Sequence, residues 1–158
     1  DSEKIRWHFM GPIQTNKIGL IVKNSYLVHS VDRERVVKKM DSESKKINKI
    51  QKILVQVNIS GETSKSGIST DDTEEFINFV DSFNNLELAG LMFLPNINQD
   101  KASHIKEIID SVALFNDMKS KRKNIKVLSL GTSSDYKECI KAGSNLIRVG
   151  EILFGPRV

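Results

Sequence analysis

The end of the chain carries two short segments whose residue types suit the binding of a phosphate group. Residues 128–135 read Leu-Ser-Leu-Gly-Thr-Ser-Ser-Asp, and residues 143–150 read Gly-Ser-Asn-Leu-Ile-Arg-Val-Gly. In each segment an apolar run typical of a strand is joined to small or polar residues, whose backbone N–H groups can surround an anion. Because a single helical stretch separates the two segments, they predict one anion site between two neighbouring strand ends.

The elements that must position this site are short strands that alternate with amphipathic helices. Continuous apolar runs indicate strands buried on both faces, and the alternation predicts parallel strands with polar residues gathered at their carboxyl ends. Both a (β/α)8 barrel and an open doubly wound sheet have this order. The glycine-rich turn usual after the first strand of the open sheet is missing, so we favour the barrel. The six runs are Trp7–Met10, Tyr26–Ser30, Ile53–Asn58, Leu88–Phe93, Val127–Leu130 and Leu146–Val149.

Three of the intervening stretches have the apolar periodicity of helices. Spacings of three, four and seven place each apolar set on one helix face, where it can cover a sheet. We expect Asp32, Asp71 and either Ser133 or Ser134 to cap the helices that follow them, and Gly143 to end the last helix. The apolar sets are Val36, Val37 and Met40; Phe76, Ile77, Val80 and Phe83; and Ile105, Ile108, Ile109, Val112 and Phe115.

Length and composition exclude several classes of protein. The 158 residues make one domain but fall short of the ~250 typical of a complete barrel. The net charge of +4 is spread along amphipathic segments, which indicates solvated helix faces and not a nucleic-acid surface. With Cys139 as the single cysteine, no apolar run of ~20 residues and no ligand-spaced Cys/His cluster, we expect a cytoplasmic domain without a disulfide, a metal ion or a membrane segment.

Six segments of the chain carry motifs in a fixed order: residues 7–17, 28–32, 55–60 with 62–67, 90–92, 128–135 and 143–150. Together these motifs resemble those of the pyridoxal phosphate homeostasis protein family. The resemblance extends over the whole chain, and it implies a barrel similar to the N-terminal domain of alanine racemase. Members of the family hold pyridoxal 5′-phosphate (PLP) as a Schiff base with a lysine.

The resemblance also implies which part of the family barrel this chain represents. The family's Schiff-base lysine lies on the first barrel strand, two strands before the Trp-His-Phe-Met-Gly motif at residues 7–11. Residues 1–158 would therefore form a single PLP-binding domain made of barrel strands three to eight, without the first two strands and without that lysine. We expect the chain alone to bind PLP weakly, or not at all, through a covalent bond.

Cofactor contacts follow from the same resemblance. Arg148 would face the pyridine nitrogen and, because a guanidinium cannot accept a proton, would leave that nitrogen unprotonated. An ordinary alternative for Arg148 is an ion pair with Asp135 or Glu151. The phosphate would lie between Gly131, Thr132 and Ser133 on one side and Val149 and Gly150 on the other.

Three further residues have two readings each. His8 either lines the pocket or is a hydrogen-bonded side chain of the barrel interior. Asn58 either faces the cofactor ring or closes the turn after its strand. Lys65 is either a solvated loop charge or an accessory lysine near the aldehyde.

Three functions fit these residues, and a PLP carrier involved in PLP homeostasis fits best. The second, an amino-acid racemase, needs two opposed proton-transfer groups, but Tyr26 and Tyr136 lie in a predicted strand and helix. The third, a barrel acting on another phosphate, would need paired carboxylates at strand ends, and Asp32 and Asp135 are better explained as caps. We expect a monomer whose partners are PLP and PLP-dependent apoenzymes.

Overall fold

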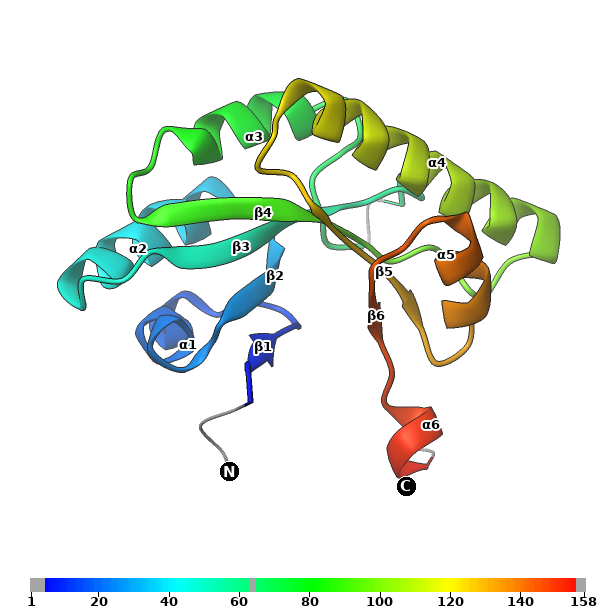
Figure 1. The fold of residues 1–158 in the computed structure, drawn as a ribbon, viewed down its shortest axis with the longest axis horizontal. Helices are drawn as coiled ribbons and strands as arrows, with labels where there is room; N and C mark the ends of the chain where they lie inside the picture. The colour runs from blue at the N-terminus through cyan, green and yellow to red at the C-terminus, as the bar shows by residue number, and fades with distance from the viewer. Residues whose placement is uncertain (1–4, 63–64, 156–158) are drawn as a thin grey trace.

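The fold is a curled, all-parallel sheet with helices around its outer side (Figure 1), in a computed structural model that describes residues 5–62 and 65–155. The strands lie side by side in chain order, without the reversal of order that defines a doubly wound sheet. This arrangement confirms the partial barrel and rejects the open-sheet alternative. The six strands are β1 (His8–Phe9), β2 (Leu27–Val31), β3 (Gln51–Val57), β4 (Leu86–Phe93), β5 (Val127–Thr132) and β6 (Leu146–Arg148).

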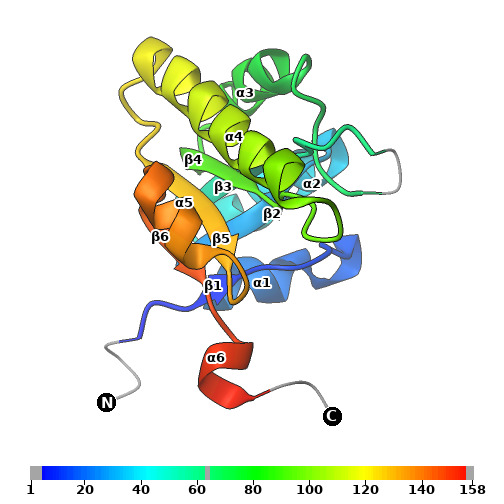
Figure 2. The ribbon, with the colours of Figure 1, turned by 90° about the vertical axis from the view of Figure 1, so that its right-hand side faces the viewer.

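Helices fill the crossovers between these strands, and Figure 2 shows the longest of them, α4, crossing the outer side of the sheet beside α5. The three helices with clear apolar periodicity form where that periodicity predicts them. On α4, however, Ile109 is 57% exposed, so it does not belong to the buried face expected from spacing. The helical elements are η2 (Thr15–Lys17), α1 (Ile18–Asn24), α2 (Glu34–Lys46), α3 (Thr73–Asp81), α4 (Lys101–Lys121), α5 (Tyr136–Ala142) and α6 (Glu151–Phe154).

Both faces of the sheet are apolar, which explains the continuous apolar runs. The outer face of the sheet packs against the helices in one large cluster that includes Ile53, Val55 and Phe93. A smaller cluster unites Leu27 of β2, Leu54 of β3, and Ala89 and Met92 of β4. Alternate residues of β3 are therefore buried in different clusters, so the middle of this strand, residues 53–55, is apolar on both faces.

Close approach of β4 and β5 requires a glycine in β4. A Cβ atom placed on Gly90 would lie 1.9 Å from the carbonyl oxygen of Val127, in the neighbouring strand. Since that oxygen belongs to the backbone, no side-chain rotation could relieve the contact. Gly90 thus allows the two strands to pair at the centre of the sheet.

The predicted helix starts are largely wrong. The residue before α2 is Arg33 and no side chain caps this helix, because Asp32 instead forms an ion pair with the Nε atom of Arg33 at 2.9 Å. Helix α3 begins after Asp72, not Asp71, and has no side-chain cap. The residue before α5 is Asp135, so neither Ser133 nor Ser134 caps it. Gly143 does end α5 in the left-handed conformation, with φ of 119°, as expected. Cys139 of the same helix is buried in the core.

The described residues contain neither a helix suited to cross a membrane nor a cluster of metal ligands. Within residues 5–62 and 65–155, no helix is both long and apolar enough to cross a membrane. Over the same ranges, no group of three or more His, Cys, Asp or Glu side chains is arranged to hold a metal ion.

Candidate functional site

A cleft of about 1360 Å³ opens where the strands end, on the side of the sheet that the alternation of elements predicts. The segments after β1, β2, β3 and β4 form most of its wall, and β5 and β6 contribute Thr132 and Arg148. Its volume exceeds the ~300–1,000 Å³ common for small-molecule sites, so a ligand the size of PLP would fill only part of it. Charged side chains of its lining are Asp32, Arg33, Arg35, Lys65 and Arg148.

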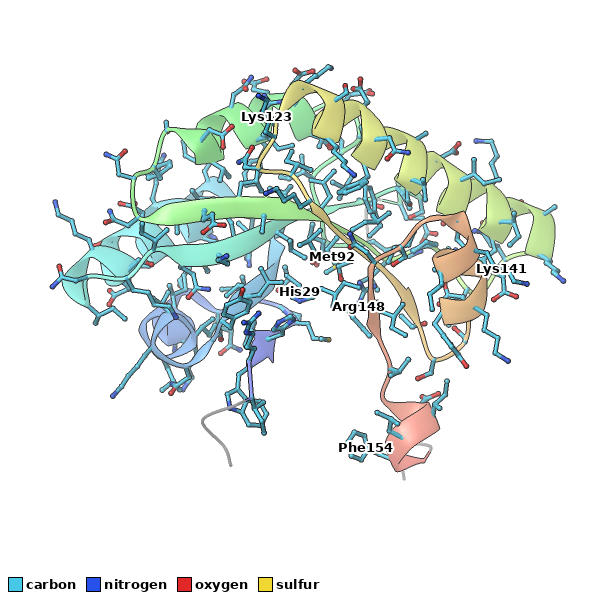
Figure 3. All side chains as sticks on the ribbon, in the orientation of Figure 1. His29, Met92, Lys123, Lys141, Arg148 and Phe154 are labelled. Atoms are coloured by element: carbon cyan, nitrogen blue, oxygen red, sulfur yellow. The ribbon has the colours of Figure 1, made fainter. Side chains whose placement is uncertain are left out.

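Arg148 is held on the concave side of the sheet by two neutral acceptors. Its Nη1 donates to Oγ of Ser129 at 2.5 Å, and its Nη2 donates to the carbonyl oxygen of Phe93 at 2.8 Å. The ion pairs with Asp135 or Glu151 that the sequence left open are therefore not formed. Burial lowers the pKa of Arg148 to about 10, which keeps the guanidinium charged at neutral pH. Figure 3 shows Arg148 near His29 and Met92 in the interior of the curl.

The two loops predicted to hold a phosphate meet directly. Oγ of Ser133, after β5, accepts a hydrogen bond from the backbone nitrogen of Gly150, after β6, at 3.1 Å. The turn needs Gly131, because its φ is +108° and a Cβ there would lie 2.9 Å from Cβ of Cys139. In the second loop, Val149 is half-buried and lies between Arg148 and Gly150 in the chain.

One donor assigned to the phosphate is already engaged. The backbone nitrogen and the hydroxyl of Thr132 both donate to Oδ1 of Asp135, at 2.7 and 2.9 Å. In the part of the chain that the structure describes, the N–H groups of Ser133 and Ser134 have no hydrogen-bond partner. The free donors of this loop therefore lie one and two residues beyond Thr132.

His8 belongs to a network inside the curl and does not line the cleft. Its Nδ1 lies 3.0 Å from Nε2 of His29, and Nδ1 of His29 lies 2.9 Å from Oγ of Ser129. Burial, aided by the charge of Arg148 and by His8, lowers the pKa of His29 to about 3, and burial also lowers the pKa of His8. Both imidazoles are neutral at pH 7.

Sequence reasoning assigned no role to His29 or Ser129. The only signal is their polarity within otherwise apolar strands, where a buried polar side chain needs a partner. Since these partners lie 100 residues apart, the sequence alone does not pair them.

Asn58 and Lys65 both form side-chain contacts within the loop after β3. Nδ2 of Asn58 donates to the carbonyl oxygen of Glu62 at 2.8 Å and its Oδ1 accepts from Ser60, so this side chain closes the turn. Nζ of Lys65 lies 3.0 Å from Oε1 of Glu62, which also accepts from Nδ2 of Asn96. Lys65 and Asn58 nevertheless line the cleft.

A second contact that the sequence did not suggest joins the first turn of α4 to the turn after β5. Nε2 of His104 lies 3.2 Å from Oδ2 of Asp135, and Nδ1 of His104 lies 2.9 Å from the carbonyl oxygen of Asn96. Asp135 therefore fixes Thr132 through one carboxylate oxygen and His104 through the other. This contact supports the turn at the end of β5.

The fold and the cleft define a partial parallel β/α barrel of the alanine racemase N-terminal type. The family model described as alanine racemase, N-terminal domain, matches residues 3–158, and the chain belongs to this family. Within it, the chain is similar to proteins named pyridoxal phosphate homeostasis protein. It is 35% identical over 154 residues to the one from Vibrio alginolyticus, 33% over 153 residues to that of Escherichia coli K12, and 30% over 156 residues to that of Buchnera aphidicola.

These matches confirm the family predicted from the motifs. They cover 98%, 97% and 99% of this chain but 66%, 65% and 68% of the three relatives, so the chain spans about two thirds of their length.

Solved structures agree on the fold. A protein of unknown function from Bifidobacterium adolescentis gives a TM-score of 0.89 at 25% identity, over 95% of this chain and 61% of that one. PipY of Synechococcus elongatus, solved with PLP bound, gives 0.85 at 22% identity, over 96% and 71%. Alanine racemase of Clostridium difficile gives 0.76 at 16% identity, over 95% and 39%.

Proposed function

We propose that this chain forms most of a PLP site and that its protein serves PLP homeostasis by holding and handing over the cofactor. The observation that carries the proposal is Arg148, a half-buried cation that lines the cleft two residues before Gly150, whose amide contacts Ser133. The names of the relatives, and the PLP bound in the structure of PipY, support the choice of ligand.

The hydrogen-bond donors of these loops and of Arg148 fit the two ends of PLP. The free N–H groups of Ser133 and Ser134, with the Ser133 hydroxyl and the Gly150 amide, suit a phosphate dianion, which accepts hydrogen bonds only. Arg148 has donors only, so it would hydrogen-bond to an unprotonated pyridine nitrogen. When bound, PLP supplies an electron sink for amino-acid chemistry, and an unprotonated nitrogen weakens that sink.

A carrier is favoured over a racemase because no tyrosine lines the cleft in the described residues. Tyr26 stacks on the ring of His8 at 5.9 Å, and Tyr136 begins α5. Lys65 faces the cleft but is paired with Glu62. These positions leave the described cleft without an evident pair of opposed proton-transfer groups.

The proposal extends to how the chain relates to its relatives. We propose that residues 1–158 correspond to barrel strands three to eight, with the first two strands and their lysine outside this sequence; the two-thirds coverage of the relatives supports this. A monomer in the cytoplasm that passes PLP to apoenzymes completes the proposal. The single cysteine, which is buried, is compatible with a reducing compartment.

The test is a titration of the chain with PLP, pyridoxal and inorganic phosphate, followed by absorbance of the ligand and by fluorescence of Trp7, the single tryptophan. We expect PLP to bind at least tenfold more tightly than pyridoxal, because only PLP engages the loops after β5 and β6. Inorganic phosphate should compete. Equal affinities for PLP and pyridoxal would reject the site, and turnover of alanine between its enantiomers would favour the racemase.

A further inference from the structure

A line of hydrogen bonds crosses the interior of the curl from β6 to β1. Arg148 contacts Ser129 on β5, Ser129 contacts His29 on β2, and His29 contacts His8 on β1, at 2.5, 2.9 and 3.0 Å. The side chains of Ser129 and His29 are fully buried. The pair β1–β2 and the pair β5–β6 lie at opposite ends of the sheet, so the contact between Ser129 and His29 bridges the curl.

The donor and acceptor capacities of the four groups decide which atom donates in each hydrogen bond of this line, and all three bonds run from Arg148 toward His8. A guanidinium can only donate, so Arg148 donates to Oγ of Ser129. The hydroxyl proton of Ser129 then needs an acceptor, and Nδ1 of His29 is the acceptor within reach. Neutral His29 consequently carries its proton on Nε2 and donates to Nδ1 of His8.

We propose that Ser129 and His29 are positioning residues, which fix the Arg148 guanidinium for the pyridine nitrogen of PLP through this one-way line. The inference rests on the proposed function, because it assigns Arg148 to the ligand ring. Arg148 has one other acceptor, the carbonyl oxygen of Phe93. With Ser129 removed, the guanidinium would keep a single contact and could rotate about it, so its free N–H groups would lose their orientation.

The direction of the line can be measured without any ligand. In the full chain labelled with nitrogen-15, the ring nitrogens of His29 should report a neutral imidazole with its proton on Nε2 throughout pH 6 to 9. The Ser129→Ala variant should remove the hydrogen bond at Nδ1 and shift that nitrogen signal alone. A His29 protonated on Nδ1, or charged at pH 7, would overturn the line.

The positioning role is tested with PLP on matched variants. Ser129→Ala and His29→Leu should weaken PLP binding roughly five- to tenfold, which is the loss expected for one ordinary hydrogen bond because the contact between Arg148 and the ligand is loosened and not removed, and they should shift the absorption band of bound PLP. His29→Asn keeps an acceptor toward Ser129 and should restore most of the affinity. Ser111→Ala removes a buried hydroxyl of α4 that donates to the carbonyl oxygen of Glu107, outside the line, so it is the control.

Competition by inorganic phosphate separates positioning from damage to the fold. Since the phosphate loops do not contact Ser129, the variants should bind phosphate as the parent chain does. Equal loss of phosphate and PLP binding, or PLP affinity unchanged in Ser129→Ala, would overturn the proposal. If the parent chain binds neither PLP nor inorganic phosphate, the proposed function fails, whereas the nitrogen signals still decide whether the line exists.

Discussion

Oγ of Ser133 and the backbone nitrogen of Gly150 are 3.1 Å apart, although 17 residues separate them in the chain. The contact holds the loop after β5 against the loop after β6. Without a ligand the serine hydroxyl is the acceptor for this amide, and a phosphate oxygen could take over that role. The relationship brings together the two motifs at the end of the sequence, as a single anion site formed by both would require.

Ser133→Asp should weaken PLP binding by well over tenfold. A carboxylate at this position would stand against the phosphate dianion and would also accept the Gly150 amide permanently, so repulsion and loss of a donor act together. Absorbance titration measures the change. Ser42→Asp adds the same charge on the exposed face of α2 and should bind like the parent; unchanged affinity in Ser133→Asp would mean that the contact is only structural.

Arg148→Ala should bind PLP more weakly, by about 1.5–3 kcal/mol, because one hydrogen bond to a charged group is lost. The substitution should not produce racemase activity, since alanine supplies neither a base nor a partner for a protonated ring nitrogen. Arg148→Lys keeps the charge but cannot reach Ser129 and Phe93 together, so it should recover only part of the affinity. Racemisation of alanine by Arg148→Ala would contradict the carrier function.

The sequence predicts the strands well because of how they are buried. Runs such as Ile53–Asn58 and Leu88–Phe93 are continuous since residues on both faces of the sheet enter apolar clusters. The helix α1 carries little signal: it has seven residues, and the first five, Ile-Gly-Leu-Ile-Val, include no polar side chain that would mark an exposed face.

Contacts between distant residues explain most of what the sequence did not predict. Short polar side chains such as Ser133 and Asp32 look like helix caps, yet Ser133 accepts from the distant Gly150 amide. Asp32 pairs with its neighbour Arg33, whose guanidinium also donates to the carbonyl oxygen of Ile13, 20 residues away. The residue type gives the capacity to accept a hydrogen bond, and only the folded chain decides which donor is nearest. The pairing of His29 with Ser129 is the extreme case, because each is simply a polar residue within an apolar strand.

Gly90→Ala should be among the most destabilising single methyl additions in this chain. The new Cβ would lie 1.9 Å from the carbonyl oxygen of Val127, so β4 and β5 would have to separate. We expect a loss of more than about 2 kcal/mol in the free energy of unfolding, at the upper end of the range for overpacking. Chemical denaturation measures it. Gly19→Ala is the control, because an alanine inside α1 meets only the flexible end of Glu43 and should be neutral or stabilising.

The free energy of unfolding should decrease as the pH falls below neutral, because His29 is protonated more readily in the unfolded chain. Its pKa is about 3 in the folded chain against 6.5 in the unfolded one, so the unfolded state binds the proton first. The resulting stability is complete above pH 6.5 and declines as the pH falls toward 3, by up to about 1.4 kcal/mol for each pH unit. Between pH 6.5 and 4.5 few carboxylates titrate, so urea midpoints there report mainly on histidines. His29→Asn should flatten the slope in this window, whereas His8→Phe, which removes a less shifted imidazole, should retain most of it. An equal slope in His29→Asn and the parent chain would show that the imidazole is not held neutral.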